Sequence, residues 1–173
     1  MHEAAFRKFG IEAHYIVLEL IPAAFKKLMS RSAKISLSGF NVTVPYKEVV
    51  MKYLDEVRPE ARAIGAVNTV YRKGTKWVGT NTDMEGFLLA LMKDGGFRPS
   101  GKRALILGAG GAARAVIYGL SREGIREVVI ADCFPEKARK ILADMKKLFP
   151  RVIYHAAKEH QYAGRAGRRT HEV

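Results

Sequence analysis

Two stretches of the sequence contain residue types at a spacing that could do chemistry. The first, Gly108-Ala109-Gly110-Gly111-Ala112-Ala113, fits the pattern G-x-G-x-x-G/A. Glycines in such a loop let the backbone approach a pyrophosphate, whose charge is stabilised by free N–H groups at a helix N-terminus. The stretch predicts dinucleotide binding through the backbone of these residues, although a tight strand-to-helix turn that binds nothing has the same form.

A carboxylate downstream bears on which dinucleotide binds. Asp132 directly follows the expected strand EVVIA, residues 127–131, and comes after the glycine stretch at about the distance that the dinucleotide fingerprint requires. A carboxylate there accepts hydrogen bonds from ribose hydroxyls and repels a 2′-phosphate, which favours NAD. Lys137 and Arg139 follow within a few residues and could reach a phosphate. The choice between NAD and NADP stays open at this point.

The second stretch is NVTVPYK, residues 41–47, and it brings candidates for binding and proton transfer. Asn41 and Thr43 alternate with valines, so both could project from one side of a strand end. Lys47 falls in the first turn of an expected helix, where a cation opposes the helix dipole, and local rule-breaking of this kind is typical of functional sites. Asp83 starts another expected helix. If the two charged side chains meet, they form a proton relay beside a nicotinamide. A surface lysine and a capping aspartate are the alternatives.

The elements that must position these residues follow from the apolar pattern, which predicts an α/β protein. The expected helices cover residues 1–10, 22–29, 82–92, 109–122 and 135–149, and a further helix follows Pro45, with its apolar residues between 49 and 57. A capping box is expected from Thr82 to Glu85. The expected strands cover 13–20, 39–44, 68–72, 76–80, 103–107, 127–131 and 152–154. After residue 103 strands and helices alternate with short connections, which predicts a parallel sheet covered on both faces. From residue 155 onward no period is present, and we expect no regular structure there.

Five separated motifs resemble those of the shikimate dehydrogenase family, in order and at similar spacing. They are MHEAAF at 1–6, GFNVTVPYK at 39–47, IGAVNT at 64–69, NTD at 81–83 and GAGGAARA at 108–115. The set is far more specific than the glycine stretch alone. The resemblance implies an oxidoreductase of aromatic amino-acid (chorismate) biosynthesis that reversibly reduces 3-dehydroshikimate to shikimate with NADPH.

The resemblance also implies an architecture. Residues 1–83 would form an N-terminal α/β substrate domain and residues 84–154 a partial Rossmann-like, parallel-sheet dinucleotide-binding domain. Residues 155–173 would be a disordered or out-of-frame tail. Because a serine-bearing segment that the family has before its Met-His stretch and further strands beyond residue 154 do not appear, we expect a fragment lacking both ends that does not catalyse turnover on its own.

Roles for single residues are likewise carried over from the family. Lys47 would shuttle the proton of the reacting hydroxyl, and Asp83 would orient the lysine. Asn41, Thr43 and Asn68 would help to hold the hydroxyl groups of the substrate. NADP-dependent members commonly carry Asn-Arg-Thr or Asn-Arg-Ser where this chain has Asp-Cys-Phe after the second dinucleotide strand, which puts the preference for NADP in question.

Composition limits the alternatives. The net charge of +13 and the pI of about 10.0 raise the question of a non-catalytic polyanion-binding protein, but no interleaving of aromatic and basic residues supports it. The longest uncharged apolar run is too short for a membrane span. A single cysteine gives neither an internal disulfide nor a metal-ligand cluster, so we expect no metal.

We therefore expect a cytoplasmic protein that acts on a small molecule, with no nucleic-acid or membrane partner, as a monomer or homodimer like its family. A catabolic quinate/shikimate dehydrogenase is the nearest alternative, supported by Asp132. Another amino-acid or folate-pathway dehydrogenase would share the glycine stretch without NVTVPYK and NTD together.

Overall fold

The computed structural model describes residues 2–31 and 36–157, which divide into two compact units, one within the first 35 residues and the other from Ser36 onward. The first unit holds α1 (His2–Lys8) and α2 (Pro22–Ser30), both at expected positions. The expected strand over residues 13–20 is wrong, because this stretch has no regular structure. Ile16 and Val17 are exposed, and a strand needs a neighbouring strand to satisfy its backbone.

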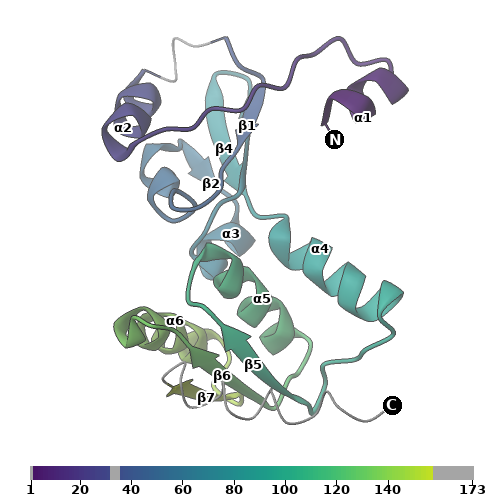
Figure 1. The fold of residues 1–173 in the computed structure, drawn as a ribbon, viewed down its shortest axis with the longest axis vertical. Helices are drawn as coiled ribbons and strands as arrows, with labels where there is room; N and C mark the ends of the chain where they lie inside the picture. Colours follow the sequence, from purple (N-terminus) through teal and green to yellow (C-terminus); the bar gives the residue numbers. More distant parts are fainter. Residues whose placement is uncertain (1, 32–35, 158–173) are drawn as a thin grey trace, which may run out of the picture. The chain divides into compact units, whose positions relative to one another are not determined.

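The second unit begins with a four-stranded sheet in the order β1-β3-β4-β2 (Figure 1). Its strands are β1 (Gly39–Asn41), β2 (Glu56–Val57), β3 (Thr69–Lys73) and β4 (Lys76–Thr80). The expected hairpin is confirmed, since β3 and β4 pair antiparallel and Gly74 has φ +61° in the turn between them. Val70 and Trp77 lie on one face of the hairpin and Val78 on the other, and all three are buried, so the hairpin is covered on both faces at these positions.

The helix expected over residues 49–57 is replaced by two elements. A 3₁₀ helix, η2, covers Val49–Tyr53, and the chain then extends into β2, parallel to β4. The backbone N–H of Asp55 donates to Trp77 O at 3.1 Å, and that of Arg58 donates to Gly79 O at 2.9 Å. Pairing with β4 therefore overrides the helical apolar period at the end of this stretch.

Two helices follow the sheet strands. α3 spans Pro59–Ile64, and α4 spans Asp83–Leu89 before it continues as a π-helical turn, η3, over Ala90–Asp94. The expected capping box is not formed, since Thr82 is the N-cap residue without a side-chain cap hydrogen bond. The side chain of Asn81 takes over, because its Oδ1 accepts a hydrogen bond from the N–H of Asp83 at 3.0 Å.

A parallel three-stranded sheet in the order β5-β6-β7 forms the rest of the unit. Its elements are β5 (Arg103–Leu107), α5 (Gly111–Arg122), β6 (Glu127–Ala131), α6 (Pro135–Leu148) and β7 (Ile153–Ala157). The expected α/β class with a parallel sheet is confirmed. The last strand runs further than expected, because residues 155–157 pair with 129–131 of β6. The remainder of the expected tail lies outside the described residues.

The helices α5 and α6 cover one face of this sheet, not both as expected. Ile117 of α5 and Ile141 of α6 share a core with Ile130 of β6. On the other face Leu105 and Leu107 of β5 are 43% and 67% exposed. Both crossovers run in the same direction along the sheet with the same right-handed sense, which places both helices on the same side.

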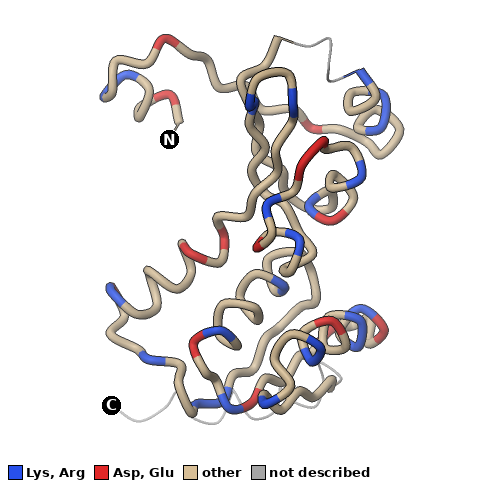
Figure 2. Tube along the Cα trace, turned by 180° about the vertical axis from the view of Figure 1, so that it is seen from behind, with Lys and Arg blue, Asp and Glu red and all other residues tan. Residues whose placement is uncertain are grey.

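The distribution of charge and the length of the helices are the two remaining features of the described residues that bear on the sequence predictions. Figure 2 shows Lys and Arg interspersed with Asp and Glu along the described elements, with both signs on α6. No helix among residues 2–31 and 36–157 is both long and apolar enough to span a bilayer.

Candidate active site

The segment 42–47, which ends at Lys47, is held against residues 67–68 by two backbone hydrogen bonds. The N–H of Val42 donates to Asn68 O, and the N–H of Val67 donates to Lys47 O, each at 2.8 Å. Lys47 lies in a turn before η2 and not in the first turn of a helix, as the sequence had led us to expect. The helix-dipole argument therefore does not apply, and the position of Lys47 follows from pairing of this segment with residues 67–68.

The structure brings Lys47 and Asp83 together. The Lys47 Nζ lies 2.7 Å from Asp83 Oδ2, and the two side chains are 13% and 28% exposed. Asp83 is the first residue of α4, where the helix dipole favours a carboxylate. Its second oxygen, Oδ1, accepts a hydrogen bond from Asn68 Nδ2 at 2.7 Å. Both carboxylate oxygens are thus engaged by residues distant in sequence, and the capping of α4 falls to Asn81.

Asn68 is the centre of a row of hydrogen bonds. It is 9% exposed, and its Oδ1 accepts from Thr69 Oγ1 at 2.9 Å and from the N–H of Thr82 at 3.0 Å. Asn41 Nδ2 donates to Thr69 Oγ1 at 3.2 Å, which joins Asn41 to the row. The row therefore runs from Asn41 through Thr69, Asn68 and Asp83 to Lys47. Thr43 is exposed in the segment after β1.

Sequence reasoning missed the positioning role of three residues. Asn81 is 4% exposed, and its Nδ2 donates to Ala66 O at 2.9 Å while its Oδ1 receives the Asp83 N–H. Thr69 and Thr82 each contact the Asn68 side chain. The repeated Asn-Thr pair at 68–69 and 81–82 was the available signal, because a short buried polar pair needs partners from another segment.

The glycine stretch has the geometry that a pyrophosphate requires. Gly108 follows β5 with φ +96°, a conformation that favours glycine, and Gly111 begins α5. A Cβ added at Gly108 or Gly110 would meet nothing within 4 Å, so the backbone is open to a ligand at these positions. The first N–H groups of α5 have no partner within the helix and are available to an anion. Residues 108–112 therefore fit a dinucleotide.

Gly111 also connects this loop to the charged pair. A Cβ added at Gly111 would lie 3.0 Å from the Cβ and 3.2 Å from the Cδ of Lys47. The first turn of α5 thus packs directly on the Lys47 side chain, and the absence of a side chain at Gly111 makes this approach possible.

Asp132 braces the glycine stretch from the end of β6. Its Oδ2 accepts a hydrogen bond from the N–H of Ala109 at 2.6 Å, and its Oδ1 accepts one from the N–H of Phe134 at 2.7 Å. A carboxylate has about four acceptor positions, so capacity for ribose hydroxyls remains. The Lys137 Nζ lies 4.5 Å from the centre of the Phe134 ring, close to the same loop. In the described residues, no three His, Cys, Asp or Glu side chains form a group that could hold a metal ion.

Comparison with known proteins agrees with this geometry. A family model described as the shikimate dehydrogenase substrate binding domain matches residues 1–70. The curated shikimate dehydrogenase (NADP(+)) of Desulforamulus reducens is 42% identical over 145 residues, which cover 84% of this chain and 50% of that protein. The chain is a homologue of shikimate dehydrogenases. It spans about half the length of the curated relatives it matches.

Solved structures of shikimate dehydrogenases and their relatives share the fold. The shikimate 5-dehydrogenase from Thermus thermophilus, in complex with NADP(H) and shikimate, has a TM-score of 0.74 and 35% identity, covering 88% of this chain and 55% of that one. A quinate dehydrogenase from Corynebacterium glutamicum in complex with NAD has a TM-score of 0.79 and 28% identity, covering 93% and 59%. The resemblance to shikimate dehydrogenases expected from the motifs is confirmed.

Proposed function

We propose that this chain carries the substrate-binding part and the first half of the dinucleotide-binding part of a shikimate dehydrogenase. The reaction would be the reversible, nicotinamide-dependent reduction of 3-dehydroshikimate to shikimate in aromatic amino-acid biosynthesis. One observation carries the proposal: Lys47 lies 2.7 Å from Asp83 while Gly111 of the dinucleotide loop packs against the same lysine side chain. A proton donor and a dinucleotide loop are thereby adjacent, as a ketone reduction needs.

Lys47 and Asp83 have separate roles in this proposal. A bound nicotinamide dinucleotide supplies the hydride to the carbonyl carbon. The Lys47 ammonium donates a proton to the carbonyl oxygen, so that the ketone becomes the hydroxyl of shikimate, and the reverse reaction returns that proton to Lys47. Asp83 holds the lysine in one orientation, supported by the amide of Asn68.

The remaining polar residues would select the substrate. Asn41 is exposed at one end of the row of hydrogen bonds, Thr43 is exposed two residues later, and Asn68 links the row to Asp83. We assign them to the substrate hydroxyl groups. In the same proposal, residues 1–83 belong to the substrate domain and 84–154 to the dinucleotide domain, and the protein is a cytoplasmic monomer or homodimer without a nucleic-acid or membrane partner.

NADP is the cofactor that the relatives favour, because the curated homologues carry NADP(+) in their names. The residues that would hold it are Gly108, Ala109, Gly110, Gly111 and Ala112, with the first turn of α5 facing the pyrophosphate. Lys137 supports a 2′-phosphate, since its ammonium lies 4.5 Å from the ring centre of Phe134, which follows Asp132 in the loop after β6.

A catabolic quinate/shikimate dehydrogenase that uses NAD is the second candidate, and Asp132 supports it. Its carboxylate stands after β6, where a 2′-phosphate would meet like charge. Affinities for NAD⁺ and NADP⁺, and for shikimate and quinate, separate the two candidates when measured side by side on the same preparation.

The test of the proposed function is binding together with turnover. We expect calorimetry to detect shikimate binding, and Lys47→Ala to abolish shikimate-dependent formation of reduced nicotinamide wherever the unsubstituted protein shows it. Lys76→Ala, which removes an exposed lysine of β4, is the matched control and should change neither quantity. Absence of shikimate and dinucleotide binding by the folded, unsubstituted chain would refute the proposal. Binding to nucleic acid that weakens steeply with salt would favour the polyanion-binding alternative.

A further inference from the structure

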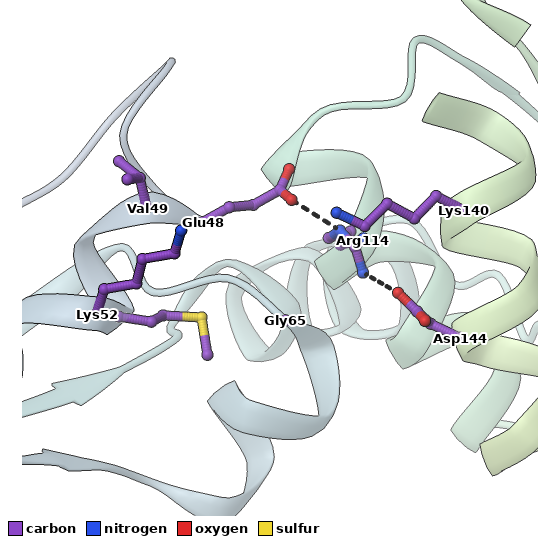
Figure 3. A pocket seen from close by; sticks show the side chains of 8 residues that line it. Glu48, Val49, Lys52, Gly65, Arg114, Lys140 and Asp144 are labelled. Atoms are coloured by element: carbon purple, nitrogen blue, oxygen red, sulfur yellow. Dashed lines mark hydrogen bonds and ion pairs between the residues drawn. The ribbon is translucent and has the colours of Figure 1, made fainter. Parts of the chain in front are cut away.

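A buried arginine joins the two sides of the second unit close to Lys47. Arg114 of α5 has a side chain that is only 5% exposed. Its Nη1 lies 3.0 Å from Asp144 Oδ2 of α6, and its Nε lies 3.6 Å from Glu48 Oε2. Figure 3 shows the guanidinium between the two carboxylates, at the edge of a cavity of about 440 Å³. Burying a charge is costly, so two acidic partners at one guanidinium point to a specific arrangement.

The ion pair between Arg114 and Glu48 connects Arg114 to the proposed catalytic lysine, Lys47. Glu48 directly follows Lys47 in the chain, and its carboxylate is 45% exposed. The Arg114 Nε is buried and has no hydrogen-bond partner, so the attraction to Glu48 at 3.6 Å is electrostatic. Because Arg114 attracts Glu48 toward α5, Glu48 restricts the backbone conformation of Lys47, the residue before it.

Arg114 also contacts the segment that leads to Asn68. Its Nη1 faces the carbonyl of Ile64 at 3.5 Å, and a Cβ added at Gly65 would lie 2.9 Å from the same nitrogen. The guanidinium thus occupies the space that a side chain at residue 65 would take. Three residues later, Asn68 donates to Asp83. One arginine therefore touches both segments whose side chains meet at Asp83.

We propose that Arg114 is a positioning residue for Lys47, acting through Glu48 and through the backbone at residues 64–65. Together with Gly111, one turn earlier on α5, it keeps the dinucleotide-loop helix and the Lys47–Asp83 pair in one fixed geometry. The inference rests on the proposed function only for the role of Lys47 in proton transfer. The positioning itself is a property of the folded chain without ligand.

The test uses the reactivity of the Lys47 amine toward a lysine-acylating reagent, measured by mass spectrometry as a ratio to labelling of exposed Lys76. Lys47 is 13% exposed and paired with Asp83, so we expect it to be labelled slowly in the unsubstituted protein. We expect Glu48→Gln and Arg114→Met each to raise the ratio about fivefold, in keeping with the loss of an ion pair. Arg114→Lys keeps the charge without the planar fork and should give an intermediate ratio.

Arg122→Gln is the matched control, because Arg122 is on the same helix and pairs with Glu60 at 2.8 Å on the surface. It should leave the ratio unchanged. An unchanged ratio in folded Glu48→Gln overturns the proposal even if Arg114→Met fails to fold, and so does an equal rise in Arg122→Gln. Labelling needs no substrate, so a chain that fails to bind shikimate refutes the proposed function and leaves this result standing.

Discussion

Replacement of Gly111 by alanine tests the link between the dinucleotide loop and Lys47. The added Cβ would lie 3.0 Å from Lys47 Cβ, 3.2 Å from Lys47 Cδ and 3.6 Å from Ala66 Cβ. Carbon atoms in good contact are about 3.5–4.0 Å apart, so the first two distances are too short by several tenths of an ångström. Lys47 Cβ has little freedom to retreat, because the backbone of Lys47 is hydrogen-bonded to Val67.

The expected stability change is small and the expected change at the site is large. Overpacking costs about 1–3 kcal/mol. Alanine in place of glycine in a helix returns up to about 1 kcal/mol. The free energy of unfolding should therefore fall by about 0–3 kcal/mol, as measured by urea denaturation. Displacement of Lys47 relative to Asp83 should raise the acylation of Lys47 relative to Lys76 about fivefold, in keeping with the loss of an ion pair.

Gly119→Ala is the control, on the same helix. There the added Cβ would lie 3.0 Å from Met84 Cγ and 3.3 Å from Leu88 Cγ, so the crowding is similar but falls on a core contact between α4 and α5. Gly119→Ala should lower stability by a comparable amount and leave the acylation of Lys47 relative to Lys76 almost unchanged. The reasoning is refuted if Gly111→Ala leaves the acylation ratio unchanged, or if both variants raise the ratio in proportion to their loss of stability.

Three further outcomes are expected. Gly110→Ala should leave the free energy of unfolding nearly unchanged, since its Cβ would meet nothing within 4 Å, yet weaken dinucleotide binding in a calorimetric titration because the methyl group occupies the approach to the backbone. Asp132→Asn should raise the ratio of NADP⁺ to NAD⁺ affinity on the order of tenfold by removing charge near the 2′-phosphate; equal affinities before and after would contradict this role, and the amide oxygen can still accept from Ala109. Burial raises the pKa of Tyr154 above the ordinary 10.0, against the opposing effect of its hydrogen bond with Ser121. The contribution of this tyrosine to stability is therefore fully present below pH 10.0 and is lost as pH rises further, because the phenol ionises first in the unfolded chain. A phenolate absorbance titration compared with Tyr154→Phe should show this tyrosine ionising after an exposed one.

Much of the fold followed from local pattern. The sequence predicted the hairpin around Gly74, the glycine stretch before a helix, and the alternation of strands and helices after residue 103. These features were predictable because turn residues and apolar periods depend on residues close together in the chain. The expectations failed where a distant partner decided the outcome. Residues 13–20 have strand-forming composition but no strand beside them, and residues 55–58 pair with β4 instead of continuing a helix.

The sequence by itself determined which residue types were available for chemistry: a lysine after a polar strand end, an aspartate after an Asn-Thr pair and a glycine loop before a helix. Only the tertiary structure decided that Lys47 and Asp83 lie 2.7 Å apart, with Asn68 on the other carboxylate oxygen. The reason is physical. Charge pairing and hydrogen bonding act over a few ångströms, and the contact joins residues 36 positions apart that only sheet pairing and the packing of α4 bring together.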